Sequence, residues 1–546
     1  MKRVFLMGMA LLLAGGMAFA AGQGEPAGED GAPVTIDWFV NEGWYNNEWD
    51  TDKPVHAYIT ENYGVEFNFQ NSAGGGTGTE KLNAMIAADD LTDVVTMGWW
   101  YSQFQDLQAA GMVHALDEVI PEYAPGLWEA VPEFMVNWYT FEEDGHWYGF
   151  PNMFWAEEQM NEKNYLTTNA GMVARQDIMD ELGITADDFK TQEGMLEALR
   201  KVRDADARYN DLDVVPLYFT PNGGFPGTYV WAGMFGIPRE DSDGNWRGGE
   251  FGGVPLEDPK SYEQLQFANE LFREGLISKE NFTADRTQIS EKIVSGSIFA
   301  LMMNVADYQG ELRDLYTADN DAVFVPVGPL HAQDGAQPYL VSSGLTGWLV
   351  SMISDDTDHL DRILPFWEWL YSKDGLLTVN YGFEGEHYTL NDEGRVEWTE
   401  SYLEMVNDPD VSATSVVGNE NLWLLQNSVT NQQVEPAPAT RGEQIGHDVW
   451  TYFAPYVYDD TAFQNLGPFG ATDEAAMAAE ISVYMEEQLP RMVLAESEAE
   501  MREIYEETLD KLQDMGIEQV RDVQNEQFQK NKDRIGIDYA WPTLRN

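Results

Sequence analysis

Apolar and polar residues alternate near the start of the chain and then take up helical spacing. The alternation over 34–40 is typical of a β-strand, so we expect ordered structure to begin there. Thr77 and Glu80 have the spacing of a capping box, and an apolar stripe follows at 82–86. The run 94–97 is short, apolar and bounded by polar residues. The pattern therefore predicts a strand, a helix and a second, buried strand.

The same strand–helix alternation continues through the rest of the chain. Asp258-Pro259 offers an N-cap and a proline at the first helical position, the apolar stripe over 262–272 follows, and Gly275 ends it. We also expect a helix over 360–371, despite its internal proline, and largely helical structure over 473–532. No internal repeat is visible. The alternation predicts α/β domains with mostly parallel sheets.

The first residues have the form of a secretory signal. A basic start is followed by the apolar run 4–14 and by Ala18-Phe19-Ala20, which predicts a signal peptide over 1–20. The apolar run is too short to cross ~30 Å of hydrocarbon. Residues 21–33 are small, polar and rich in glycine and proline, so we expect a disordered leader there.

Composition bounds the number of domains and the redox chemistry. With 546 residues, 43% of them hydrophobic, the chain exceeds what one core fills, and two or more domains are expected. Cysteine is absent, which excludes disulfides, thiolate metal sites and cysteine nucleophiles. The cysteine that anchors many secreted binding proteins to lipid is absent with it, so a periplasmic location is expected.

The formal net charge is −63, which disfavours nucleic acid and anionic membranes as partners. Such charge also destabilises a compact state unless salt screens it. A saline habitat is one interpretation, and an acidic but ordinary surface is the other. The acidic surface also makes a neutral ligand easier to accept than a polyanion.

Catalytic motifs are missing from the sequence. It contains no HExxH, no G-x-S-x-G and no phosphate-binding loop, and its seven histidines are scattered. The glycine-rich stretch 73–79 is read as a flexible turn in preference to an anion cradle. Chance carboxylate pairs such as Glu157-Glu158 leave glycoside hydrolysis open.

Aromatic residues carry the stronger signal. The chain has 18 tryptophans, many of them beside polar or turn-like sequence. A sugar ring has an apolar face that stacks on aromatic rings and a hydroxyl rim that polar side chains satisfy. Core packing is the competing explanation for any single ring, but the set favours a sugar cleft. The candidates are Trp44, Trp99, Trp100, Tyr101, Trp155, Trp231 and Trp423.

Four segments resemble one family in the same order along the chain. They are 81–95 (KLNAMIAADDLTDVV), 111–124 (GMVHALDEVIPEYA), 144–152 (DGHWYGFPN) and 367–390, which contains NYGFEGEHYTL. This pattern resembles the family 1 extracellular solute-binding proteins, and in particular the oligosaccharide-binding subgroup often called LipO or YtcQ-like.

The resemblance implies a two-lobed periplasmic-binding-protein fold of type II, with each lobe a mostly parallel sheet flanked by helices and crossing strands between the lobes. We expect one lobe from 34–150 plus about 302–349. The other lobe then comprises about 151–301 plus 350–546, with a C-terminal helical extension. The implied function is the substrate-binding subunit of an ABC importer, which captures an oligosaccharide by lobe closure and delivers it to a membrane permease. We expect a monomer with no cofactor, no bound metal and no enzymatic activity.

The resemblance also suggests where ligand contacts lie. Trp99, Trp100 and Tyr101 follow the first signature strand, and Asn152 and Trp155 follow the first crossing. The second lobe and the return crossing add further candidates, which are Tyr229, Trp231, Asn304, Tyr308 and, after the last crossing, Trp423. Glu384, His387 and Tyr388 are more simply explained as a hydrogen-bonded turn.

One stretch departs from the pattern of its relatives. Some relatives carry a calcium loop just before an Ile-Pro-Leu, and the corresponding segment here is 204–217. Its loop glycine is missing, Arg208 adds a positive charge, and Val214 replaces the terminal acid. Calcium requires several oxygen ligands and a tight turn, so we predict that none binds. Arg175 is a candidate partner for a uronate carboxylate, although a surface ion pair is the favoured explanation.

Two other functions stay open from the sequence alone. A secreted glycoside hydrolase or lyase would use a similar aromatic cleft, with two carboxylates across the sugar. A sensor subunit would present sugar to a receptor without transport.

Overall fold

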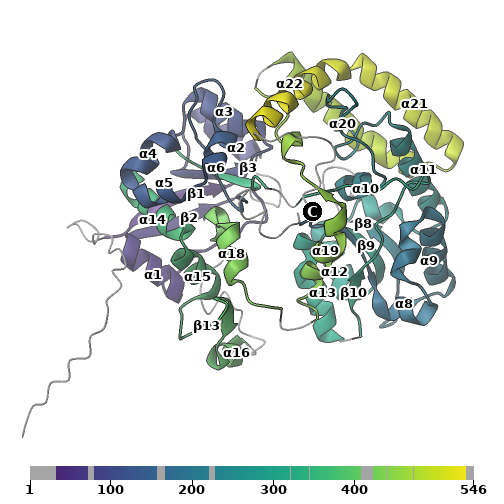
Figure 1. Cartoon of the computed structure of the whole chain (residues 1–546), viewed down its shortest axis with the longest axis horizontal. Coiled ribbons are helices and arrows are strands. Elements are labelled where there is room, and N and C mark those ends of the chain that lie inside the picture. The colour runs from purple at the N-terminus through teal and green to yellow at the C-terminus, as the bar shows by residue number, and fades with distance from the viewer. Residues whose placement is uncertain are drawn as a thin grey trace, which may run out of the picture.

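The computed structural model describes residues 32–71, 79–155, 167–219, 228–319, 321–342, 345–406, 422–438, 441–470 and 472–535. Within these residues the chain forms two α/β lobes side by side, each built on its own sheet (Figure 1). The predicted signal peptide, most of the predicted leader, Thr77 and most of the glycine-rich stretch lie outside the described residues. Strand β1 begins at Val34, as the alternation predicts.

The first lobe contains a five-stranded sheet in the order β2-β1-β3-β12-β4. Strand β1 runs parallel to β2 and β3, whereas β12 runs antiparallel to β3 and β4. Its strands are β1 (Val34–Val40), β2 (Val65–Gln70), β3 (Val94–Gly98), β4 (Phe150–Pro151) and β12 (Leu349–Ile353).

Helices and a small hairpin surround this sheet. The helices are α1 (Pro54–Tyr63), α2 (Thr79–Ala88), α3 (Ser102–Ala110), α4 (Leu116–Tyr123), α5 (Pro125–Ala130), α6 (Glu133–Tyr139), α14 (Leu360–Tyr371), α15 (Lys373–Tyr381), α16 (Glu400–Val406), the short η3 (Trp423–Leu425) and α18 (Ser428–Val434). The hairpin pairs β13 (Tyr388–Leu390) with β14 (Val396–Trp398).

The second lobe contains a four-stranded sheet in the order β10-β5-β9-β8. Only β8 and β9 run parallel, and β5 is antiparallel to both of its neighbours. The α/β class is therefore confirmed, but the sheets are mixed instead of mostly parallel, because β12 is reversed in the first sheet and β5 is reversed in the second. Its strands are β5 (Ala170–Arg175), β8 (Val215–Phe219), β9 (Ile298–Asn304) and β10 (Phe324–Pro326).

The helices of the second lobe include one with a clear sequence signal. In α11 the Asp258 carboxylate accepts a hydrogen bond from the Lys260 backbone N–H at 2.9 Å, and the apolar stripe behind it is buried. The helices are α8 (Gln176–Leu182), η1 (Ala186–Lys190), α9 (Gln192–Asp204), α10 (Thr228–Met234), α11 (Pro259–Arg273), η2 (Lys279–Phe282), α12 (Arg286–Val294), α13 (Val305–Ala318) and α19 (Ile445–Phe453). A hairpin of β6 (Arg208–Tyr209) and β7 (Leu212–Asp213) follows α9.

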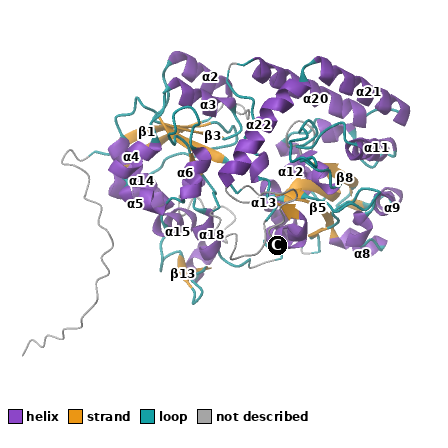
Figure 2. Ribbon diagram, turned by 45° about the horizontal axis from the view of Figure 1, so that its top comes forward, coloured by secondary structure: helices purple, strands orange, loops and turns teal. Residues whose placement is uncertain are grey.

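Three C-terminal helices join the lobes. Helices α20 (Asp473–Val493) and α21 (Glu498–Asp514) pack on α11, and α22 (Ile517–Ile535) lies between the two lobes in both views (Figures 1 and 2). Phe528 of α22 is buried in the first lobe's core. On the same helix, Lys530 and Arg534 pair with Glu142 at 2.7 and 2.6 Å. Helix α22 therefore connects the end of the chain back to the first lobe.

The division of the chain between the two cores differs from the expected one. Residues 305–340 pack in the second core, because β9 pairs along its length with β5 and the chain continues there through α13 and β10. The return to the first lobe is made by β12, and 349–371 pack in the first core. The expected assignment of 302–349 to the first lobe and of all of 350–546 to the second is therefore wrong in both parts.

Short pairings mark the connections between the lobes. Phe154 packs in the first core and Ala170 in the second. Leu340 packs in the second core and Leu349 in the first, and Leu425 packs in the first core and Ile445 in the second. Strand β11 (Leu340–Val341) pairs in parallel with β15 (Val457–Tyr458), flanked by η4 (Ala454–Tyr456) and η5 (Thr461–Phe463). These segments run along the edge of the first lobe where the candidate site lies.

Candidate ligand-binding site

Three tryptophans from distant parts of the chain lie together with near-parallel rings, and this cluster is here called the tryptophan platform (Trp44, Trp348 and Trp423). The ring of Trp44 lies 6.0 Å from that of Trp348 and 5.9 Å from that of Trp423, with interplanar angles of 7° and 13°. Trp348 and Trp423 are 5.6 Å apart at 17°. Trp44 is 49% exposed although it is a large apolar side chain. The exposed Trp44 ring, with two partly buried rings nearly parallel to it, is suited to stacking against another flat apolar face.

Hydrogen bonds hold the platform in place. The indole N–H of Trp44 donates to Oε2 of Glu42 at 2.9 Å. The Asn152 side-chain oxygen accepts from the backbone N–H of Trp348 at 3.3 Å and of Leu349 at 2.9 Å. Trp99 donates from its indole to the Gly347 carbonyl at 3.1 Å. The Trp44 ring and the backbone around Trp348 are therefore held in place before any ligand arrives.

The order of strands explains why these residues meet. Strands β1 and β3 are parallel neighbours, so their carboxyl ends lie at the same edge of the sheet. Asn41 and Glu42 follow β1, and Trp99 follows β3. The antiparallel β12 begins at that edge, which places Trp348 beside them. Ligands of α/β sheets bind at the carboxyl ends of the strands, and the platform occupies this position.

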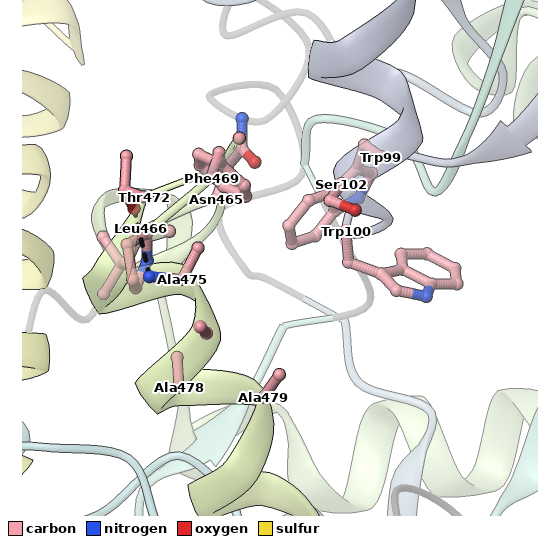
Figure 3. A pocket seen from close by; sticks show the side chains of 14 residues that line it. Trp99, Trp100, Ser102, Asn465, Leu466, Phe469, Thr472, Ala475, Ala478 and Ala479 are labelled. Atoms are coloured by element: carbon pink, nitrogen blue, oxygen red, sulfur yellow. Dashed lines mark hydrogen bonds between the residues drawn. The ribbon is translucent and has the colours of Figure 1, made fainter. Parts of the chain in front are cut away.

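A pocket of about 580 Å³ lies next to the platform, here called the alanine pocket. Trp99 and Trp100 form one side, and the start of α20 forms the other (Figure 3). Trp100 is 43% exposed, and its ring folds over Gly98, where any Cβ would lie 2.4 Å from the ring. The lining residues are Trp99, Trp100, Ser102, Asn465, Leu466, Gly467, Pro468, Phe469, Gly470, Thr472, Ala475, Ala476, Ala478 and Ala479. None of these carries a charge, so the pocket suits an uncharged group.

Glu42, which accepts the hydrogen bond from Trp44 of the platform, has a strongly shifted pKa. Burial raises the pKa of its carboxyl from 4.5 to about 7, and the hydrogen bond from Trp44 opposes that rise. Glu42 is 9% exposed. Its second oxygen accepts no hydrogen bond from any residue in the described ranges. A carboxyl group with a free acceptor thus lies at the edge of an exposed ring.

A second buried acid lies where the chain crosses between the lobes. Ser342 donates a short hydrogen bond to Asp460, and Gln464 donates to the same carboxylate at 3.4 Å. Burial raises the pKa of Asp460. Tyr139 donates to the Thr346 carbonyl at 2.6 Å, which ties this crossing to the first lobe. These contacts fix the segment from which Trp348 projects.

The structure brings together six of the residues predicted from sequence. Trp44 and Trp423 belong to the platform, and Trp99 and Trp100 line the alanine pocket. Tyr101 packs beside Trp100, with ring centroids 5.5 Å apart. Asn152 is fully buried and positions Trp348. Trp155 is a seventh residue nearby, since its backbone N–H donates to Leu345 at 2.9 Å and its ring packs there.

The candidates from the second lobe have structural roles instead. Trp231 is 1% exposed and packs on Phe219 and Phe267, so its place in the core corrects the prediction that it meets ligand. Tyr308 is 2% exposed and lies beneath Arg286, so the prediction that it contacts ligand is also corrected. Asn304 caps α13 by accepting from the Ala306 N–H at 3.1 Å. The Tyr229 side chain lies outside the described residues.

Two further candidates are explained by local contacts. Arg175 is fully buried, pairs with Asp177 and lies 4.5 Å from the Tyr209 ring, so it is not placed to meet a uronate. His387 is 2% exposed, and its ring accepts a hydrogen bond from the Phe383 backbone N–H at 3.0 Å. This contact forms the hydrogen-bonded turn that explains the motif without a ligand.

Sequence reasoning missed Glu42, Asn41 and Trp348. The first two directly follow a strand at its carboxyl end, and this position is the signal in the sequence that marks them. Asn41 is fully buried, and neither polar atom of its side chain has a partner in the part of the chain that the structure describes. Trp348 had no signal of its own, because its value depends on the antiparallel entry of β12 beside β3.

Metal ligation and membrane spanning can be assessed over the described ranges. Within them, no group of three or more His, Cys, Asp or Glu side chains lies close enough to hold a metal ion. None of the described helices combines the length and apolarity that crossing a membrane requires.

Two lobes with an aromatic site beside their connections define a solute-binding protein. The family model described as "Bacterial extracellular solute-binding protein" matches residues 48–376, and the chain belongs to this family. Among curated proteins none matches the sequence.

Solved structures of similar fold are distant in sequence. The S. pneumoniae ABC-transporter substrate-binding protein FusA, in complex with kestose, has 16% identity and a TM-score of 0.69, with 92% of this chain and 100% of that chain covered. The alginate-binding protein AlgQ2 without calcium ion has 17% identity, a TM-score of 0.65 and coverage of 91% and 98%. A solute-binding protein from Bifidobacterium longum infantis, titled as HMO-binding and ABC-transporter associated, has 14% identity, a TM-score of 0.65 and coverage of 91% and 99%.

Proposed function

We propose that the chain is the extracytoplasmic substrate-binding subunit of an ABC importer, which captures an oligosaccharide by lobe closure and delivers it to a membrane permease. The tryptophan platform carries this proposal, because the exposed Trp44 ring, supported by two near-parallel and partly buried rings, fits the apolar face of a sugar ring. The fold neighbours named for kestose, alginate and HMO binding support the ligand class.

We further propose that the protein acts as a monomer in the periplasm and breaks no covalent bond. Ligand held between two lobes stabilises the closed arrangement by its differential affinity, which is all that a delivery subunit needs. An enzyme that hydrolyses a glycosidic bond by the usual route would instead require two carboxyl groups that flank this bond.

The first test is calorimetric titration and thermal unfolding with a panel of oligosaccharides, alongside an assay for new reducing ends. Binding at 100 times the dissociation constant adds about 2.7 kcal/mol to the folded state, which raises the unfolding midpoint measurably. Stoichiometric binding without product supports the proposal. Product formation, or no binding by any sugar, contradicts it.

Trp44→Ala tests the platform itself. We expect affinity for the bound sugar to fall at least about tenfold, with little change in the unfolding midpoint because the ring is half exposed. Leu212→Ala, which removes a 45% exposed side chain from the β6–β7 hairpin, is the matched control and should leave affinity unchanged.

A further inference from the structure

We propose that Glu42 is a ligand-contacting specificity residue of this site, which selects neutral oligosaccharides and rejects acidic ones. The proposal rests on the function proposed above, because it concerns the same platform. It adds the class of saccharide that the platform accepts.

The geometry gives Glu42 one occupied oxygen and one available oxygen. Oε2 accepts from the indole of Trp44 at 2.9 Å, which fixes the carboxyl group against the platform. Oε1 accepts no hydrogen bond from any of the described residues. It is also not one of the fully buried polar atoms that lack a partner. A ring stacked on Trp44 places its hydroxyl rim near this free acceptor, and hydroxyl donors satisfy it.

No cation offsets the carboxyl group. Within the described ranges, neither lysine nor arginine pairs with Glu42 or lies over a ring of the platform. The alanine pocket, whose wall residue Trp99 donates its backbone N–H to the Trp348 carbonyl, is lined entirely by uncharged residues. A uronate carboxylate bound here would face a like charge at low dielectric and would itself have no partner.

The pKa of Glu42 supports this assignment. Burial is the main cause of its rise to about 7, and the only other contribution is the opposing hydrogen bond from Trp44. Tyr45, a buried side chain three residues further along the chain, has a pKa raised by burial and stays neutral near pH 7. Closing the second lobe removes more water, so a second negative charge becomes still less acceptable.

The test compares neutral and acidic oligosaccharides of similar length by calorimetric titration at pH 8. The neutral probes are kestose, a neutral milk tetrasaccharide and a mannose oligosaccharide, and the acidic probes are mannuronate and galacturonate trisaccharides. We expect at least one neutral probe to bind and the acidic probes to bind at least a hundredfold more weakly.

Glu42→Gln identifies the residue responsible. Glutamine keeps the shape and one acceptor oxygen but removes the charge. The affinity for neutral probes should therefore fall about tenfold, and the ratio of neutral to acidic affinities should narrow at least tenfold. In the unmodified protein the gap should also narrow from pH 8 to pH 5.5 as Glu42 takes up a proton, and in the variant it should not change. Glu61→Gln, an exposed acid on α1, is the matched control and should match the unmodified protein.

The outcomes separate the two proposals. If no saccharide binds, the proposed function itself is wrong. If neutral and acidic probes bind equally, or Glu42→Gln leaves the gap and its pH dependence unchanged, Glu42 is not the specificity residue although the platform still binds sugar.

Discussion

At the scale of single residues, the same side chain has opposite roles in the two lobes. Trp44 is 49% exposed and forms part of a platform, whereas Trp231 is 1% exposed and fills a core. Both follow polar or turn-like sequence, so composition alone does not separate them. What separates them is the neighbouring structure, since Trp44 follows the carboxyl end of β1 and Trp231 lies inside α10 against Phe267.

Glu42 should make the stability of the unliganded protein depend on pH. Its pKa rises from 4.5 in the unfolded chain to about 7 in the folded protein, so the folded state binds the proton more tightly. The stabilising contribution is therefore complete below pH 4.5 and is lost as pH rises through 7. Glu42→Gln has no such loss, so we expect it to be more stable than the unmodified protein at pH 8 by roughly 2–3 kcal/mol.

Urea unfolding at pH 5 and pH 8 measures this difference. The difference in free energy of unfolding between Glu42→Gln and the unmodified protein should be much smaller at pH 5, where Glu42 is mostly protonated in the folded protein. An advantage of equal size at both pH values would show that Glu42 is not held in a desolvating site.

At the scale of elements, the pattern of apolar residues predicted most strands and helices where they occur. β1, α14 and the C-terminal helices lie where the spacing placed them, because each carries a local signal. The direction of strand pairing is harder to predict from the sequence. Strand β12 pairs antiparallel with β3 and β10 pairs antiparallel with β5, and no residue pattern within β12 or β10 indicates this direction. Trp348 was missed for that reason.

Helix α22 should depend on one largely buried arginine. Arg521 is 13% exposed and pairs with Glu250, itself 4% exposed, at 2.8 Å and with Glu257 at 2.6 Å. Arg521→Ala leaves a buried carboxylate without its partner, which we expect to cost roughly 3–5 kcal/mol in urea unfolding. Arg502→Ala breaks the exposed pair with Glu498 and should cost under about 1 kcal/mol.

A second substitution distinguishes charge from packing at this position. Adding Glu250→Gln to Arg521→Ala removes the stranded charge, so part of the lost stability should return. If the double variant is no more stable than Arg521→Ala, the arginine acts through its packing.

The β6–β7 hairpin should not respond to calcium. Arg208 pairs with Asp213 at 2.9 Å, so a cation of the protein occupies a carboxylate that a calcium loop would need. We expect the same unfolding midpoint in calcium and in chelator, with magnesium at equal concentration as the control for general screening. A rise specific to calcium, with stoichiometric metal after desalting, would contradict this prediction.

At the scale of the whole molecule, two lobes could be expected from length and from the resemblance, but their boundaries could not. The chain crosses between the lobes several times, and each lobe's core recruits segments from far along the sequence, such as 349–371 in the first. An apolar strand is equally compatible with either core, so only the pairing of β9 with β5 decides that 305–340 belong to the second.

The net charge of −63 should make the stability of the whole molecule depend on salt. Like charges on a compact surface repel one another, and salt shortens the range of that repulsion from about 30 Å at 0.01 M to about 3 Å at 1 M. We therefore expect the unfolding midpoint at pH 7.5 to rise by several degrees between these concentrations. Near pH 4 many carboxylates are protonated, so the same change of salt should have a much smaller effect. An equal midpoint in dilute and in molar salt at pH 7.5 would mean that the acids are compensated locally and that a saline habitat does not explain them.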